Sequence, residues 1–466
     1  MSKFDYATYL SPFTWRYGSK EMREIWSELY KRKLWRKIWV ELAKSQQKYG
    51  LLTKTEFNDL ILHQNNIDID KAHEIEKEIH HDLMAEIKTY ASFAKIGGGK
   101  IHLGATSMDI EDNADTLRIK QSLEIVEIKL KNLLREFSKK IKQYKGLPCM
   151  AYTHLQPAEP TTLGYRFALY AQDVLIDIKL LDFVKGQLKG KGFKGAVGTS
   201  ASYLTLLRDS NRVTEMEKEI MKNLGIDAVD ISSQVTPRKI EYFIACFLSA
   251  VAQTLHKFAF DVRIMQSQGF SEWQERFSQK QVGSSAMPFK KNPINCEKVC
   301  SLARIVFNLS NISKDNACNM LLERTLDDSA NRRIYLPEMF LATDEILQSS
   351  IGIIEGLLIN KKQIKKNLDN YGLFSIIEMV LMEVVLNGGD RQKIHEHLRR
   401  LSMRGWEELQ RSGKNTIIKL IKKDSIINKY VKKEKIERLL NPEKYIGLAP
   451  KKCLDLLKKI DNELSN

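Results

Sequence analysis

The chain has 466 residues, with 74 Lys and Arg against 58 Asp and Glu, which gives a formal net charge of +16 at pH 7. Apolar residues make up 43% and charged residues 28%, a mixture typical of a folded globular protein and unlike that of a disordered chain. No apolar run approaches the roughly 18 residues that a membrane-spanning helix needs, so we expect no membrane partner.

Proline is scarce and unevenly placed. None of the ten prolines lies between Pro12 and Pro148 or between Pro337 and Pro442, and proline interrupts helix interiors. Apolar residues recur at three- to five-residue intervals over residues 22–42, 119–134, 165–181, 240–262 and 334–358. We therefore expect a mainly α-helical protein with long central helices in a bundle.

Glycine and proline clusters predict four loops. They cover residues 97–104, 154–162, 186–203 and 282–295. Each carries polar or titratable residues, and loops held on a helical scaffold often carry function. Composition changes nowhere sharply, so we place domain boundaries near residues 110 and 360.

The six cysteines are scattered without the spacing of a disulfide framework. This usage fits reduced thiols and predicts a cytoplasmic protein. Lys and Arg are spread along helix-like segments, which favours solvated helix faces. Two alternatives stay open: an anionic small substrate attracted by the positive field, or an RNA-binding surface.

Three histidine positions stand out. His80 and His81 precede Asp82, which is consistent with a capping cluster, half a metal site, or a group that positions substrate. His102 follows a glycine turn, and His154 lies in a polar, proline-bearing loop. A histidine there is a reasonable proton donor, because its unperturbed pKa lies near working pH. No motif with metal-ligand spacing is present, so we expect no catalytic metal.

The segment GSSAMPFKKNP, from Gly283 to Pro293, is the most informative stretch. Its glycine, serines and lysines suit a mobile loop whose backbone N–H groups bind an anion. It matches neither a Walker A loop nor a hydrolase nucleophile elbow, and an ordinary basic surface loop is the alternative. In ERTLDDSANRR, Arg324, Ser329 and Arg333 suit a phosphate or carboxylate, or else a salt-bridge network with the neighbouring aspartates.

These segments resemble the adenylosuccinate lyase family within the aspartase/fumarase superfamily. GSSAMPFKKNP is similar to the superfamily signature. RYGSKEM from Arg16, the His81-Asp82 pair, HLGATS from His102, Thr153-His154 and ERTLDDSANRR resemble that family in particular, most closely its animal-type branch. The resemblance runs in order from about residue 10 to 460.

The resemblance implies an all-α, three-domain protomer with a long central helical bundle. Its domains would be an N-terminal domain, a central bundle with signature loop 282–295, and a C-terminal domain, over residues 1–110, 111–360 and 361–466. It implies a homotetramer whose active sites are shared between subunits. It also implies β-elimination of fumarate from two anionic purine nucleotides, adenylosuccinate and succinyl-aminoimidazole-carboxamide ribotide, without a cofactor.

By resemblance, Ser284 is the catalytic base and His154 the acid. Lys290 stabilises negative charge, Glu297 orients His154, and His81 either positions substrate or joins proton transfer. The implied substrate-binding residues are Arg16, Tyr17, His80, Asp82, Thr106, Ser107, Gln234, Lys298, Arg324, Ser329 and Arg333.

Some positions depart from the family pattern. His80 and Lys298 stand where arginine is usual, so the planar fork of a guanidinium is lost there. Ser200 replaces a glutamine, and Val235-Thr236 replaces a Thr-Tyr pair. Alternative functions are another fumarate-releasing lyase, such as argininosuccinate lyase, or a catalytically silent helical scaffold or RNA-binding protein.

Overall fold

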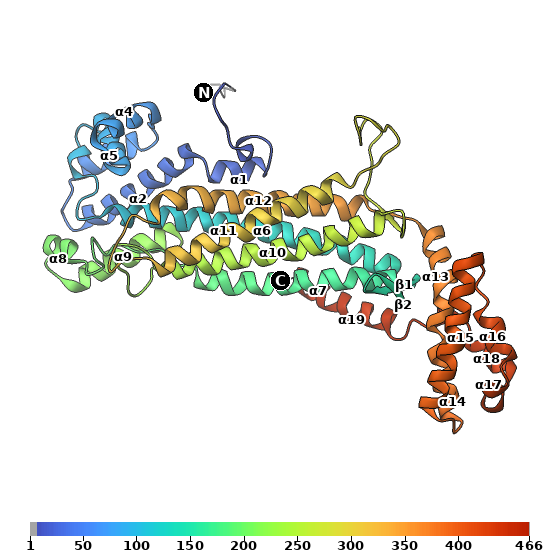
Figure 1. Cartoon of the computed structure of the whole chain (residues 1–466). Coiled ribbons are helices and arrows are strands. Elements are labelled where there is room, and N and C mark those ends of the chain that lie inside the picture. The colour runs from blue at the N-terminus through green and yellow to red at the C-terminus, as the bar shows by residue number, and fades with distance from the viewer. Residues whose placement is uncertain (1–6, 466) are drawn as a thin grey trace. The chain divides into compact units, whose positions relative to one another are not determined.

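Long helices dominate the computed structural model, which describes residues 7–465 (Figure 1). The five longest are α6 (Ser107–Tyr144), α7 (Leu163–Gln187), α10 (Arg238–Gln266), α11 (Ile294–Cys318) and α12 (Ser329–Gly356). They contain four of the five predicted helical segments almost entirely. The expected all-α fold with long helices is confirmed.

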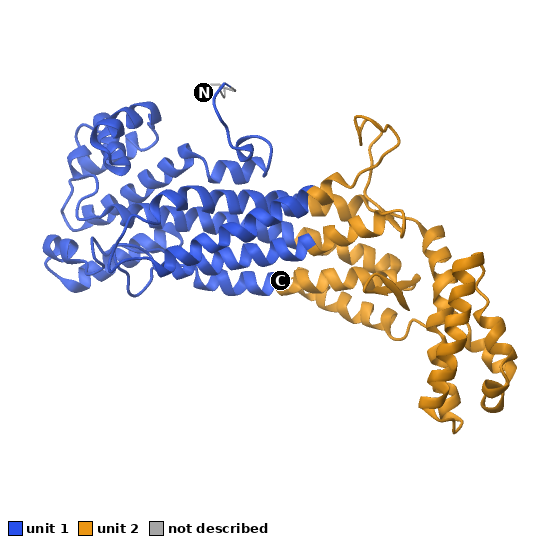
Figure 2. Ribbon diagram, viewed as in Figure 1, with its two compact units in different colours: residues 1–130, 177–256, 298–348 blue, residues 131–176, 257–297, 349–466 orange. Residues whose placement is uncertain are grey.

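The chain forms two compact units, coloured separately in Figure 2. The first comprises residues 1–130, 177–256 and 298–348, and the second comprises residues 131–176, 257–297 and 349–466. The proposed division into three domains at residues 110 and 360 stays a prediction.

Shorter helices complete the first unit. They are η1 (Pro12–Thr14), α1 (Lys20–Ile25), α2 (Glu28–Lys48), α3 (Lys54–His63), α4 (Ile69–Ile79), α5 (Asp82–Phe93), η2 (Gly98–Lys100), α8 (Ala201–Leu207) and α9 (Ser210–Leu224). The apolar face of α2 packs into its core, where Ile38, Trp39 and Leu42 are almost fully buried.

The C-terminal part of the second unit is also helical. Its elements are α13 (Lys361–Ser375), α14 (Ile377–Leu386), α15 (Arg391–Ser412), α16 (Ile417–Lys423), α17 (Ser425–Tyr430), α18 (Lys433–Leu439), η3 (Pro442–Lys444) and α19 (Ala449–Ser465). Ile376, Val380 and Val384 lie at the centre of a core formed by α14 to α18 and their connections.

The predicted helix over residues 22–42 is interrupted. Helix α1 ends at Ile25, and Ser27 caps the start of α2 by accepting a hydrogen bond from the Tyr30 N–H (3.1 Å). A serine in this position competes for the backbone and favours a new helix start over a continuous helix. The break leaves Leu29, one of the predicted stripe residues, 44% exposed.

The predicted loop over residues 154–162 is largely a β-strand. Strands β1 (Pro148–Thr153) and β2 (Gln156–Thr162) pair antiparallel, with Thr153 opposite Gln156. A second two-stranded pair joins β3 (Trp273–Gln274) to β4 (Leu358–Ile359). Pro157 and Pro160, which suggested a loop, are tolerated because this ribbon has only two strands and therefore only edges.

Helix α10 is long and apolar enough to pass a test for a membrane span, and among residues 7–465 it is the one helix that does so. More than half of its most apolar window is buried inside the protein. Core helices of bundles are equally long and apolar, so the length and composition of α10 alone do not indicate a membrane-spanning helix.

Candidate active site

Four predicted substrate-binding residues line one cleft in the first unit. Asp82 comes from the start of α5, Arg324 from the loop before α12, and Ser329 and Arg333 from the first turns of α12. The cleft has a volume of about 190 Å³. Five cationic side chains line it in all: Lys31, Arg118, Arg324, Arg332 and Arg333. Four acidic side chains also line it, Glu28, Asp82, Glu111 and Asp115. The cations outnumber the acids by one, which mildly favours an anion.

Asp82 and Arg333 form an ion pair across this cleft. Arg333 Nη2 donates to Asp82 Oδ2 at 2.7 Å. Burial alone would raise the pKa of Asp82, but the Arg333 guanidinium outweighs it and the net pKa lies below the ordinary value. The other oxygen accepts from the Leu83 N–H at 2.7 Å. Asp82 is therefore a fixed carboxylate that orients Arg333.

His81 and His80 have backbone roles at helix ends. The imidazole of His81 caps α5, because its Nδ1 accepts from the Met84 N–H at 3.3 Å. The proton of neutral His81 is then on Nε2, on a half-exposed side chain. His80 ends α4 in the left-handed conformation (φ 54°). The capping interpretation is confirmed for His81.

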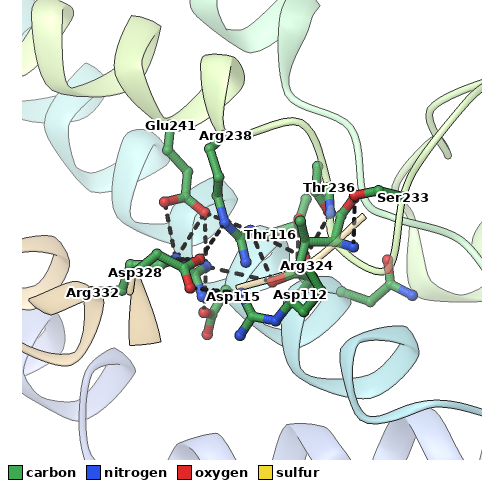
Figure 3. Close-up of polar contacts among 12 residues, drawn as sticks. Asp112, Asp115, Thr116, Ser233, Thr236, Arg238, Glu241, Arg324, Asp328 and Arg332 are labelled. Carbon is green, nitrogen blue, oxygen red and sulfur yellow. Dashed lines mark hydrogen bonds and ion pairs between the residues drawn. The ribbon is translucent and has the colours of Figure 1, made fainter. Parts of the chain in front are cut away.

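Asp115, Arg324 and Arg332, which line the cleft, also belong to a buried ionic network (Figure 3). Arg332, next to Arg333 in sequence, donates to Glu241 and Asp115, with the shortest contact, 2.7 Å, to Glu241 Oε1. Arg238 pairs with Asp112 (3.0 Å) and with Asp328 (2.7 Å). Because successive helical residues point about 100° apart, Arg332 enters this network while Arg333 reaches Asp82.

Arg324 belongs to both the network and the cleft. Its Nη1 donates to Asp328 Oδ1 at 2.6 Å, which confirms the salt-bridge alternative for this residue. Its Nη2 is buried and has no hydrogen-bond partner among residues 7–465. A buried donor without a partner is costly. The free N–H group is therefore available to an anion that enters the cleft.

The segment with Arg16 and Tyr17 is fixed to α12. The Gly18 N–H donates to Glu345 Oε2 (3.1 Å), and Lys298, on α11, pairs with Oε1 of the same residue (2.6 Å). Arg16 is exposed, with its guanidinium carbon 5.7 Å from the ring centroids of both Trp15 and Tyr17. Lys298 thus supports the Arg16 segment through Glu345.

The remaining predicted binding residues of the first unit lie at backbone-controlled positions. Thr106 precedes α6 and donates its N–H to Asp109 Oδ2 (3.1 Å), and Ser107 is the first residue of that helix. The Gln234 N–H donates to the carbonyl of Glu323 (3.2 Å), which ties its loop to the segment before α12.

His154 lies at the tip of the β1–β2 hairpin in the second unit. With Thr153 opposite Gln156, the turn has two residues, and both His154 (φ 55°) and Leu155 (φ 59°) have positive φ. This is the geometry of a type I′ turn, which usually contains Asn or Gly. Such strain at non-glycine residues is concentrated at functional sites. The side chain of His154 is exposed.

Ser284 lies in a long segment without helix or strand between β3 and α11. Its Oγ accepts hydrogen bonds from the N–H groups of Met287 (3.1 Å) and Ala286 (3.3 Å). A Cβ atom at Gly283 would lie 1.9 Å from the carbonyl oxygen of Lys290, so only glycine permits this loop closure. Two donors aimed at Oγ would stabilise negative charge on the hydroxyl.

Both ends of the segment from residue 275 to 293 are clamped. The Glu275 carboxylate accepts from the N–H groups of Asn295 (3.1 Å) and Cys296 (3.0 Å) at the start of α11. Gln266 accepts from the Glu275 N–H (2.8 Å) and donates to the Lys291 carbonyl (2.9 Å).

A second cleft, in the second unit, is lined by Lys290 and Glu297. In the described part of the chain, no hydrogen bond or ion pair joins His154, Ser284 and Lys290 to one another. The structure thus brings together the four residues of the first cleft, and it leaves the assignment of the catalytic set as a prediction.

Sequence reasoning missed six charged residues that line the first cleft: Glu28, Lys31, Glu111, Asp115, Arg118 and Arg332. Glu111 and Asp115 are four apart on α6 and so share a helix face, a signal that was available in the sequence. Nothing in the local pattern of Lys31 or Arg118 distinguishes them from other basic residues of amphipathic helices.

Comparison with known families gives two matches. A model described as "Lyase" matches residues 19–308, and one described as "Adenylosuccinate lyase C-terminus" matches residues 375–453. Together they span most of the chain.

Curated relatives are similar over nearly the whole chain. Adenylosuccinate lyase of Schistosoma mansoni is 38% identical over 432 residues, covering 91% of this chain and 88% of the relative. The Saccharomyces cerevisiae enzyme is 35% identical and covers 99% and 96%. The Archaeoglobus fulgidus enzyme is 36% identical and covers 94% and 96%.

Solved structures share the fold. A fumarate lyase from Mesorhizobium sp. BNC1 has a TM-score of 0.84 at 21% identity and covers 97% of this chain and 99% of its own. A 3-carboxy-cis,cis-muconate lactonizing enzyme from Pseudomonas putida has a TM-score of 0.85 at 20% identity, covering 97% and 99%. At this identity the likeness concerns the fold alone.

Proposed function

Because the chain belongs to the adenylosuccinate lyase family, we propose that it cleaves the C–N bond of adenylosuccinate to give AMP and fumarate. It is a lyase of the aspartase/fumarase superfamily. The proposed second substrate is succinyl-aminoimidazole-carboxamide ribotide, an intermediate of purine biosynthesis. Both are anionic nucleotides.

The observation that carries this function is the anion-binding cleft. Arg324, Ser329 and Arg333 offer two guanidinium forks and a hydroxyl to a phosphate group, and the unpartnered Nη2 of Arg324 supports this role. Arg16 and Tyr17 are proposed to add contacts from the segment fixed on α12.

The proposed chemistry is a β-elimination. Ser284 removes a proton from the carbon next to a carboxylate, and the electron pair is held as an aci-carboxylate. When the C–N bond breaks, that pair forms the double bond of fumarate and the leaving nitrogen takes a proton from His154. The two N–H groups that donate to Ser284 Oγ support its role as a base, since they favour its ionised form.

Three further residues have proposed supporting roles. Lys290 is exposed on the same loop as Ser284 and would neutralise the aci-carboxylate. Glu297, in the first turn of α11, would orient His154. His81, with the Nε2–H tautomer set by its capping bond, would donate a hydrogen bond to substrate.

We also propose a homotetramer in the cytoplasm, in which His154 and Ser284 of different subunits complete one site. Large apolar side chains exposed on the single chain support self-association, among them Ile176 on α7, which is 57% exposed. The reduced-type cysteine usage supports the location.

Fumarate release tests the function. We expect purified protein to release fumarate from adenylosuccinate and from the ribotide, but not from argininosuccinate. Ser284→Ala and His154→Ala should each lower kcat at least about 100-fold, whereas Ser285→Ala, which removes the adjacent hydroxyl, should stay within a few-fold of the unmodified protein. Tight RNA binding at physiological salt without fumarate release would instead favour a scaffold or RNA-binding protein.

A further inference from the structure

Glu111 is a carboxyl group without a counter-ion inside the cationic cleft. It lies on α6, is half-buried, and lines the same cleft as Arg324, Ser329 and Arg333. Among residues 7–465 its carboxyl group has no hydrogen bond and no ion pair within 4 Å. The proposed phosphate contacts do not include it.

The cations around Glu111 are each engaged by another acid. From α12, Arg333 pairs with Asp82 of α5 (2.7 Å) and Arg332 with Asp115 (3.0 Å). From α2, Lys31 pairs with Glu28 at 2.8 Å.

The other cations of the cleft are engaged in the same way. Arg118 pairs with Asp115 on α6, and Arg324 pairs with Asp328. Asp112 of α6 is bound to Arg238 in the buried ionic network. The charges of Asp82, Asp112 and Asp115 therefore oppose ionisation of Glu111, and the one nearby cation that favours it, Arg333, is paired with Asp82.

This arrangement favours the neutral form of Glu111. Burial is the largest cause, and the charges of Asp82 and Asp115 add to it, so that the pKa of Glu111 is raised to about 8. At neutral pH the group is a carboxylic acid, which has an O–H to donate and carries no charge.

We propose that Glu111 is a further substrate-binding residue: as a neutral acid it donates its O–H to the phosphate group held by Arg324, Ser329 and Arg333, and as a carboxylate it repels that group. This role of Glu111 rests on the proposed function. It adds to the phosphate-binding residues a hydrogen-bond donor that is present only while the carboxyl group is protonated. Binding of the nucleotide then weakens as pH rises through 8, because one more negative charge faces the phosphate.

The test measures binding of AMP, the proposed product, by calorimetry between pH 7 and 9.5. The phosphate second pKa is about 6, so the ligand stays a dianion over this range. We expect the Kd of the unmodified protein to rise about 10-fold from pH 7 to 9, which follows from one ionisation near pH 8.

Two substitutions of Glu111 separate the effect of its hydrogen-bond donor from the effect of its negative charge. Glu111→Gln keeps a donor and never ionises, so its Kd should match the unmodified protein at pH 7 and change less than about 2-fold up to pH 9. Glu111→Ala has neither donor nor charge, so it should bind more weakly at pH 7 and show the same flat profile. Far-UV circular dichroism confirms that each variant is folded.

The matched control is Glu28→Gln, which removes an acid of the same cleft that is already paired with Lys31. It should keep the steep rise of Kd with pH. An unchanged pH profile in Glu111→Gln would overturn the proposal, as would a flat profile in the unmodified protein.

Fumarate release at pH 7 is measured in the same samples. No release by the unmodified protein would refute the proposed function. The change of the AMP Kd with pH tests the role of Glu111 independently of that result.

Discussion

At the scale of single residues, Arg332 and Arg333 show how adjacent identical side chains take different roles. Arg332 is buried and makes bonds to Glu241 and Asp115, whereas 55% of the Arg333 side chain is exposed and its guanidinium meets Asp82 in the cleft. A buried charge that loses its partners is costly, while an exposed one is free to exchange its partner for a ligand.

Lysine substitutions of the two arginines should therefore affect different properties, substrate binding for Arg333 and stability for Arg332. Arg333→Lys is expected to raise KM about 10-fold with an unchanged Tm, because the bidentate contact is lost. Arg332→Lys is expected to lower the free energy of unfolding by about 2–4 kcal/mol, because Lys cannot bridge both acids. Thermal unfolding and steady-state kinetics of the pair check this, and equal KM values in both variants would contradict the assignment.

His102 is a second residue whose surroundings fix its protonation state. It has positive φ (68°), and its Nδ1 accepts from the Trp39 indole N–H at 3.1 Å. Burial lowers the pKa of His102 to about 4. In the unfolded chain a histidine titrates near 6.5, so between these values the unfolded state binds more protons than the folded state.

Acid should therefore destabilise the protein partly through His102. Its neutral form stabilises the fold fully above pH 6.5, and this contribution falls as pH drops towards 4, by on the order of 2–3 kcal/mol. His102→Asn keeps an acceptor for Trp39 and tolerates positive φ, so the variant should lose less stability between pH 7 and 4.5. The Tm at pH 7 and at pH 4.5 checks this, with a substitution of an exposed histidine, His395→Asn, as control. An equal fall in Tm between these pH values in the unmodified protein and both variants would exclude the effect.

At the scale of elements, the segment from residue 275 to 293 combines clamped ends with a free middle. Glu275 is 4% exposed and accepts the first N–H groups of α11, where a helix also favours negative charge. Residues 285–291, in contrast, are all exposed. A loop built this way moves without unfolding its base, as closure over a substrate requires.

Loosening the base should expose the loop to protease. Glu275→Gln removes the charge at the start of α11 at a cost of about 1 kcal/mol, which corresponds to roughly a five-fold larger open population. Trypsin should then cut after Lys280 and Lys290 about five times faster. The exposed Gln279→Ala serves as control, and identical cleavage rates would show that Glu275 does not hold the loop.

The helices follow from the sequence because their causes are local. The predicted stripe on α6, from Ile119 through Leu123, Val126 and Leu130 to Leu134, is at most 2% exposed throughout. The hairpin was missed because its prolines signal loops and because its turn holds His154 and Leu155 where Asn or Gly is usual. Its pairing is a contact between strands, which local patterns do not encode.

The candidate site was predicted only in part, again because local sequence patterns do not encode contacts between distant segments. Motif resemblance identified Asp82, Arg324, Ser329 and Arg333, and the structure places them together. Which of two adjacent arginines pairs with Asp82 depends on the rotation of α12 about its axis relative to α5 and α6, and the lack of a counter-ion at Glu111 depends on how the five cations of the cleft are paired. Both are tertiary facts that a single sequence does not contain.

At the scale of the whole molecule, α7 leaves an apolar stripe uncovered. Leu169, Ile176 and Phe183 follow one another at seven-residue intervals, which places them on one helix face, and they are 51%, 57% and 50% exposed. A seven-residue apolar repeat is what a helix presents to a partner helix. The stripe therefore fits the proposed assembly of several copies of this chain.

A charge in this stripe should break the assembly. Ile176→Glu would bury an unpaired carboxylate in the proposed interface, at a cost of several kcal/mol per contact, so light scattering should show smaller species than the tetramer expected for the unmodified protein. Fumarate release should fall in parallel, because a site completed by another subunit is lost on dissociation. Leu62→Glu on α3, where an apolar side chain is 73% exposed, should leave assembly and activity unchanged. A fully active monomer of Ile176→Glu would exclude sites shared between subunits, and an unmodified protein that is already monomeric would exclude the tetramer.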